Sequence, residues 1–226
     1  MAGRGFDRTI VAGALALMTQ AAQADVPRPL AGTYNGSEME VGTELRLEAN
    51  GRYQYYLSYG ALDETSQGTW TADRGGITLT SDAVKAPEFE LVETKLGKGK
   101  ELVVSLDTPE QLPLQLFSVF LVQPDGNVAE VPFEDGPLHI PMKAGKAPSE
   151  MAIALPVYQV ASQPYALSPG RRTMHFRFVA NDLGKVAFNH YRLAWDGQAF
   201  VLKRFDRVLR FRKEVPQNQS QGAQPD

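Results

Sequence analysis

The sequence predicts an all-β protein, with an N-terminal antiparallel meander or small barrel followed by a β-sandwich-like region. Two observations support this fold class. Almost every periodic stretch alternates polar and apolar residues with period two, as strands with one solvated face do. Turn motifs such as Asn50-Gly51, Asp125-Gly126 and Asp196-Gly197 separate these stretches at short intervals, which is typical of antiparallel strands.

Residues 1–24 have the layout of a secretory signal peptide. Arg4 and Arg8 form a short basic start, residues 10–18 (IVAGALALM) are apolar, and Ala22-Gln23-Ala24 is an A-x-A cleavage site. The apolar stretch is too short to cross a bilayer. We therefore expect a mature protein that begins after Ala24 and is periplasmic or secreted.

Composition excludes several classes of protein. The chain has no cysteine, so it is neither a disulfide scaffold nor a lipoprotein anchored through an N-terminal cysteine. Without residues 1–24 its net charge is −4, which argues against nucleic acid as a partner. No later stretch approaches the ~18 apolar residues of a membrane-spanning helix. Residues 216–226 are rich in Gln and Pro, and we expect them to form a disordered tail.

The first predicted strands form a hairpin. Leu45 and Leu47 share one face of the first strand, and Asn50-Gly51 supplies the positive φ angles of a type I′ turn. The return strand places Tyr53, Tyr55, Leu57 and Tyr59 on a common face. Further alternating stretches at 66–72 and 77–82 extend the meander, and Trp70 lies on the inward face of the first of these.

A family resemblance rests on three stretches: GTYNG (32–36), GTELRLEANGRYQYYLSYG (42–60) and SQGTWTADRGGITLTSD (66–82). Together they resemble the N-terminal domain of NlpE-type envelope lipoproteins. The resemblance implies a small lipocalin-like β-barrel in the cell envelope and nothing catalytic. The lipidated cysteine and the C-x-x-C pair of that family are absent, so copper binding and surface anchoring are not implied here.

We place a boundary between two domains in the Gly-, Lys- and Pro-rich window 95–113. Residues 25–106 then form the barrel or meander and residues 107–215 the sandwich-like domain. The stretch 114–122 (LQLFSVFLV) is apolar on both faces, as expected of a central strand. A short strand at 128–133 and five more alternating stretches up to residue 213 complete the predicted second domain.

Two groups of side chains are candidates for binding. The first consists of inward-facing aromatic residues of the barrel: Tyr34, Tyr53, Tyr55, Tyr59 and Trp70. They either fill the core or line a cavity for a small amphiphilic ligand, since a barrel of ~8 strands can do either. The second is a cationic stretch for an anionic partner: Arg204, Arg207, Arg210 and Arg212. A plain solvated strand face also explains that stretch.

Local motifs for catalysis or cofactor binding are missing from the sequence. The three histidines, His139, His175 and His190, lie in separate predicted strands without metal-ligand spacing. There is no G-x-S-x-G, no S-x-x-K and no phosphate-binding loop. We therefore expect no metal, no cofactor and no enzymatic activity, although a site assembled from distant residues would leave no local motif.

These observations favour an exported, non-enzymatic β protein of the bacterial envelope that binds a small amphiphilic ligand or another envelope component. The alternative is a structural or interaction protein that docks to a membrane-associated assembly and holds no small molecule. An enzyme comes third. The sequence does not indicate an oligomeric state.

Export can be tested directly on the protein purified from its own host. N-terminal sequencing should read Asp25-Val26-Pro27, because the basic, apolar and A-x-A segments occur in the order that signal peptidase requires. A mature protein that retained Met1 would contradict cleavage and the extracytoplasmic location together.

Overall fold

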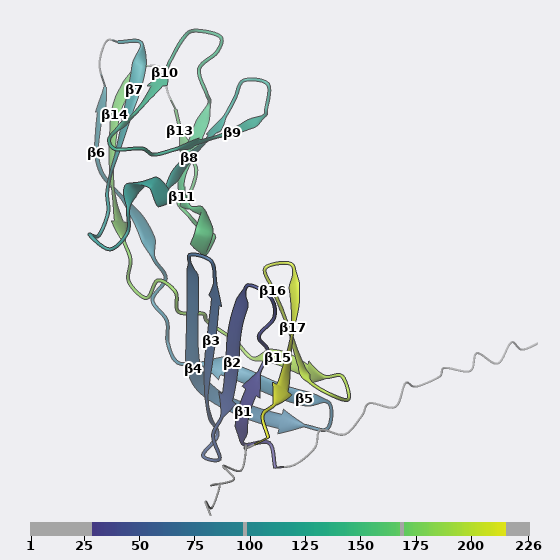
Figure 1. Cartoon of the computed structure of the whole chain (residues 1–226). Helices are drawn as coiled ribbons and strands as arrows, with labels where there is room; N and C mark the ends of the chain where they lie inside the picture. The colour runs from purple at the N-terminus through teal and green to yellow at the C-terminus, as the bar shows by residue number, and fades with distance from the viewer. Residues whose placement is uncertain (1–28, 97–98, 168–169, 216–226) are drawn as a thin grey trace, which may run out of the picture.

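The computed structural model describes residues 29–96, 99–167 and 170–215, and it is all-β apart from two short 3₁₀ turns, η1 (Leu114–Leu116) and η2 (Pro156–Tyr158). The predicted signal peptide and C-terminal tail lie outside the described residues. Figure 1 shows a barrel with a second β region at one end of it. Within the described part of the chain, no helix is long and apolar enough to span a bilayer.

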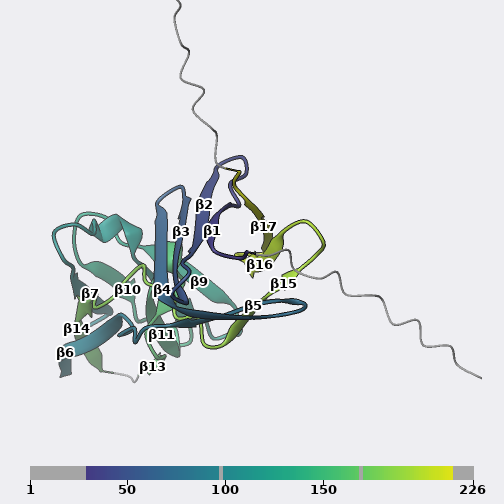
Figure 2. The same cartoon turned by 90° about the horizontal axis from the view of Figure 1, so that it is seen from below.

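Eight antiparallel strands close into the barrel, in the order β1-β17-β16-β15-β5-β4-β3-β2. They follow one another around a ring in Figure 2. Their bounds are β1 (Gly32–Asn35), β2 (Val41–Leu47), β3 (Arg52–Tyr59), β4 (Leu62–Asp73), β5 (Gly76–Ser81), β15 (Tyr191–Trp195), β16 (Phe200–Arg204) and β17 (Arg207–Lys213).

The first hairpin has the predicted faces but a different turn. Leu45 pairs with Tyr55 and Leu47 with Tyr53, and all four side chains are buried. Of the two predicted turn residues only Gly51 has a positive φ, at 83°. The Gly51 N–H donates to the Glu48 carbonyl at 3.1 Å, and the Glu48 N–H donates to the Arg52 carbonyl at 2.8 Å. The loop therefore has three residues and ends in a left-handed glycine, so the type I′ assignment was wrong.

The second region consists of two sheets packed face to face. One sheet has the order β10-β7-β14-β6, and its β7 and β14 are parallel. The other contains β12-β11-β8-β9, with β13 also paired to β11. The bounds are β6 (Glu88–Leu96), β7 (Glu101–Asp107), β8 (Ser118–Val122), β9 (Val128–Pro132), β10 (Leu138–Pro141), β11 (Glu150–Leu155), β12 (Val160–Ala161), β13 (Tyr165–Ala166) and β14 (Arg171–Val179).

The all-β class, with a barrel and a sandwich-like region, is confirmed, but the predicted division of the strands between them was wrong. Strand β6 ends in the predicted boundary window and β7 lies within it, yet both pair with β14 in one sheet of the second region. Strands β15, β16 and β17, predicted to belong to the sandwich, complete the barrel. The two-sheet region is therefore an insertion between β5 and β15. Turn-rich composition marks a connection, but it does not show which strands pair across the fold.

Each region has its own hydrophobic core. In the barrel, Leu45, Tyr53, Ile77, Phe200 and Phe211 are all fully buried. In the insertion, side chains from both sheets meet in a second core. Its members include Leu102, Val104, Phe117, Val119, Phe133, Ile153, Met174 and Phe176. The alternation along each strand sorts these residues inward, as sheets with one solvated face require.

Gly68 on β4 permits a close approach between neighbouring strands of the barrel. A Cβ atom at this position would lie 2.1 Å from the Thr80 carbonyl oxygen on β5. Gly68→Ala should therefore lower the free energy of unfolding by more than about 2 kcal/mol, because the backbone of β5 has to move away from the added methyl group. Gly42→Ala on β2 is the control, since no atom lies within 4 Å of its Cβ position. Urea unfolding of both variants checks this, and equal stabilities would contradict the packing described.

Candidate functional site

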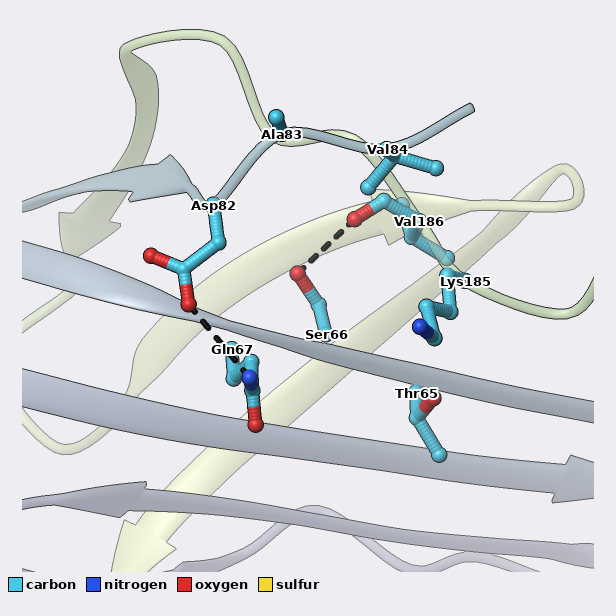
Figure 3. Close-up of a pocket in the computed structure, with 8 residues that line it drawn as sticks. All are labelled: Thr65, Ser66, Gln67, Asp82, Ala83, Val84, Lys185 and Val186. Atoms are coloured by element: carbon cyan, nitrogen blue, oxygen red, sulfur yellow. Dashed lines mark hydrogen bonds between the residues drawn. The ribbon is translucent and has the colours of Figure 1, made fainter. Parts of the chain in front are cut away.

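The candidate site is a cleft at the neck of the molecule, where the chain leaves the barrel and returns to it. It lies between β4 and the connecting segments around residues 82–84 and 185–186, as Figure 3 shows. Its volume is about 170 Å³. It is lined by Thr65, Ser66, Gln67, Asp82, Ala83, Val84, Lys185 and Val186.

The length of β4 creates this neck cleft. β5 pairs with β4 only from Gly68 onward, so the first half of β4 is open on that side. The returning segment covers part of it. The Thr65 N–H donates to the Gly184 carbonyl and the Val186 N–H donates to the Thr65 carbonyl, both at 2.8 Å. The outgoing segment begins at Asp82, whose N–H donates to the Gln67 carbonyl at 2.9 Å. The neck cleft is the space between this segment, the returning segment and β4.

Hydroxyl groups form a network on the barrel side of the neck cleft. The Tyr53 hydroxyl lies 2.8 Å from Ser66 Oγ and 3.0 Å from Ser81 Oγ. Ser66 Oγ donates to the Val186 carbonyl at 2.8 Å, and Ser81 Oγ accepts from the Phe188 N–H at 2.7 Å. These contacts tie the returning segment to β3, β4 and β5.

Neither serine of this network is arranged as a nucleophile. A reactive serine needs an adjacent general base to take its proton. Among the described residues, Ser66 Oγ and Ser81 Oγ bond to each other, to the Tyr53 hydroxyl and to peptide groups, and none of these is basic enough. The network is therefore suited to holding the neck together.

Charged groups stand at the two sides of the neck cleft. Asp82 receives hydrogen bonds from both terminal nitrogens of Arg52, at 2.9 and 2.6 Å, and this pairing lowers the pKa of the carboxyl. On the other side, Lys185 Nζ lies 2.7 Å from Asp182 Oδ1, which lowers the pKa of Asp182. Figure 3 shows Asp82 and Lys185 on opposite sides of the space. The neck cleft thus combines opposite charges with the apolar side chains of Val84 and Val186.

The five aromatic residues predicted to bind a ligand do not line one pocket. Tyr34 is buried, and its hydroxyl donates to the Leu30 carbonyl at 2.6 Å; burial raises its pKa to about 12. Tyr53 belongs to the hydroxyl network. The Trp70 indole N–H donates to the Glu48 carbonyl at 3.0 Å, and its ring packs against the barrel core. Tyr59 is 36% exposed and its ring lies under the Arg207 guanidinium, 4.8 Å away.

Tyr55 is the exception among these hydroxyls. It is 3% exposed, and its oxygen is buried without a hydrogen-bond partner among the described residues. The nearby Thr43 hydroxyl donates instead to the Tyr56 carbonyl at 2.6 Å. Burial, reinforced by the negative charge of Glu64, raises the pKa of Tyr55 far above its ordinary value. Its ring meets Phe188 edge-on at 5.3 Å, so aromatic packing surrounds it.

A buried ion pair lies beside Tyr55. Glu64 on β4 points into the barrel, is 5% exposed, and accepts a hydrogen bond from Arg204 Nε at 2.9 Å. A second bond joins the same carboxylate to a terminal nitrogen of Arg204. Glu64 was not predicted as a site residue. The local signal for its inward direction is that it alternates along β4 with Leu62 and Ser66, which are also buried.

The four arginines predicted as a cationic face do not act as one surface. Arg204 turns inward to Glu64, Arg207 covers Tyr59, and Arg210 is paired with Asp196. Arg212 is exposed on the outer face, where β17 pairs with β1 at Asn35. A hydrogen-bonded partner or an aromatic ring therefore engages three of the four, which weakens the case for an anionic partner at this position.

Each of the three histidines contacts a different neighbour, and His190 Nδ1 lies 3.0 Å from Asn189 Oδ1. His175 Nε2 lies 3.0 Å from Asp107, and His139 Nδ1 lies 3.2 Å from Glu101. Among residues 29–96, 99–167 and 170–215, no group of three or more potential ligand side chains could hold a metal ion.

The tyrosines at 53 and 55 provide a matched pair of substitutions on one strand. Tyr53→Phe should cost about 1–2 kcal/mol of unfolding free energy, since it removes a hydroxyl that bonds two serines. Tyr55→Phe should be neutral or stabilising by up to about 1 kcal/mol, because it removes an unpaired buried hydroxyl. Chemical denaturation measures both, and a large loss on Tyr55→Phe would show that its hydroxyl has a partner.

Comparison with known proteins adds no relative. The chain matches no protein-family model, no curated protein and no solved structure. The resemblance to NlpE-type domains therefore stays a prediction from its motifs.

Proposed function

We propose that the chain is an exported, non-enzymatic binding or accessory module of the bacterial envelope. Its site for a small amphiphilic ligand is the neck cleft and not the barrel interior. Export rests on the signal-peptide pattern of residues 1–24.

One observation carries the proposal: the barrel is filled by its own side chains. Fully buried residues from β2, β3, β5, β16 and β17 meet inside it. The Tyr34 ring lies 5.2 Å from that of Phe200, and the Tyr55 ring lies 6.3 Å from that of Phe211. A barrel of about eight strands has room either for such side chains or for one small ligand. In this barrel the side chains take the space.

The lining of the neck cleft suits an amphiphile. Val84 and Val186 offer apolar surface, while Asp82, Gln67 and Lys185 offer a carboxylate, an amide and an ammonium group. Its volume of about 170 Å³ is small beside the roughly 300–1,000 Å³ of sites for drug-sized ligands. The expected ligand is therefore a molecule of a few heavy atoms, or the end group of a larger envelope component.

The non-enzymatic character is supported by how the polar groups near the neck cleft are used. The two serines bond to each other, to Tyr53 and to backbone groups. Asp82 and Lys185 are each engaged with an oppositely charged neighbour. Groups committed in this way hold a structure together more readily than they transfer protons.

A second candidate function is an interaction protein without a small ligand. The observation that favours it is the exposure of β6, where Leu91, Val92 and Leu96 are all exposed large apolar residues at the edge of a sheet. Exposed apolar edges are typical places for one protein to meet another.

Filling the neck cleft tests the leading proposal. In native mass spectrometry of the protein purified from its own host, we expect a bound small molecule. With the short amphiphiles butanoate and butylamine as probes in ligand-observed NMR, Val84→Phe should weaken binding at least about tenfold, since the larger ring occupies the space. Val128→Phe, at an exposed valine on β9, is the matched control.

Three outcomes separate the proposals. Loss of binding in Val84→Phe, with retention in Val128→Phe and Tyr55→Phe, places the ligand at the neck. Loss of binding in Tyr55→Phe alone would place it in the barrel and overturn the leading proposal. A wild-type protein that carries no small molecule and binds no probe, but co-purifies with another protein, would favour the interaction function.

A further inference from the structure

Strand β6 is an unpaired edge of the inserted region. It is the last strand of the order β10-β7-β14-β6, and no described strand pairs with its other side. It is nine residues long and contains no proline. The other terminal strands are shorter, since β10 has four residues and ends in Pro141, and β9 has five and ends in Pro132. Proline and short length are two features that protect a sheet edge, and β6 has neither, although it carries a bulge and charged side chains.

The second half of β6 carries two exposed charged residues between two exposed apolar ones. A bulge at Val92 interrupts the pairing with β14, since His175 faces Glu93 while Phe176 faces Leu91. Beyond the bulge, Glu93 and Lys95 lie on one face of the strand, and Lys95 Nζ is 3.0 Å from Glu93 Oε1. Thr94 faces Met174 on the other face. Val92 and Leu96, at the two ends of this segment, are 46% and 73% exposed.

We infer that β6 pairs with β6 of a second copy of this chain, in antiparallel orientation, with the two-fold axis at Thr94. This register places Glu93 opposite Lys95 twice and Val92 opposite Leu96 twice, while Thr94 faces its own equivalent. The facing residues of the segment are thus self-complementary, as a two-fold interface requires. The two four-stranded sheets would continue into each other.

Neighbouring registers lack this complementarity. A centre at Glu93 places that carboxylate opposite itself, and like charges directly opposite destabilise a strand pair. A centre at Val92 places Glu93 opposite Leu91 and leaves Lys95 opposite Phe89. The register centred at Thr94 therefore forms two cross-strand pairs of opposite charge and keeps the apolar residues together.

The expected dimer is weak, because a five-residue strand contact is much smaller than a standard interface of roughly 1,600 Å². We therefore expect a dissociation constant of the dimer between about 10 µM and 1 mM. The inference does not depend on a ligand at the neck, and it holds or fails independently of that proposal.

The test uses sedimentation velocity of the mature full-length chain at about 10 µM to 1 mM. The wild type should shift from monomer to dimer across this range. Glu93→Lys and Lys95→Glu should each weaken dimerisation at least about tenfold, because each places like charges opposite one another. Both positions are exposed, and circular dichroism checks that the variants fold.

Mixing the two variants gives the decisive result. One variant then has only positive charges at positions 93 and 95 and the other only negative ones, so an equimolar mixture should recover dimers. The double variant Glu93→Lys/Lys95→Glu should dimerise like the wild type. Glu130→Lys, an exposed reversal on β9 in the other sheet, is the control and should change nothing.

Each opposite result overturns the inference. A wild type that stays monomeric at about 1 mM excludes the pairing. Single variants that dimerise as strongly as the wild type, or a mixture that does not recover dimers, would exclude the register. A dimer lost in Glu130→Lys would place the interface on the other sheet.

Discussion

The pairing of β1 with β17 closes the barrel, and the rest of the architecture depends on it. Tyr34 faces Lys213 and Asn35 faces Arg212, so residues almost 180 positions apart share a ladder. The same closure requires β15 to find β5, where Leu193 faces Ile77. Once these two ladders form, everything between β5 and β15 has to leave the barrel as a loop and return beside its exit. The two-sheet insertion and the neck both follow from that constraint.

Closure also determines what the barrel can do. Side chains from both halves of the chain meet inside, such as Tyr34 with Phe200 and Tyr55 with Phe211. The C-terminal strands supply the phenylalanines that fill the space between the tyrosines of β1 and β3. An interior packed in this way holds the fold together.

Two surface features belong to the insertion: the neck cleft, where it joins the barrel, and the outer edge of β6, where one of its sheets ends. At the neck, the hydroxyls of Tyr53, Ser66 and Ser81 fix the returning segment, and the cleft lies between it, the outgoing segment and β4. In the insertion, β6 is the last strand of its sheet, and no strand of the described residues pairs with its outer edge. The neck cleft is small and combines apolar and charged side chains, whereas the outer side of β6 is an extended strand edge. They suit different occupants, a small amphiphile at the neck and another strand at β6.

Alternation along the chain was enough to predict the all-β class, the two strands of the first hairpin and the inward direction of Tyr34, Tyr53 and Tyr55, because alternation along a strand is local. It did not determine the partners of β15, β16 and β17, and so it assigned them to the wrong region. It also placed Arg204 with Arg207, Arg210 and Arg212 on one cationic stretch, whereas tertiary structure turns Arg204 inward to a buried Glu64. The physical reason is the same in each case. Periodicity decides which way a side chain faces, but only the pairing of strands distant in sequence decides what it faces.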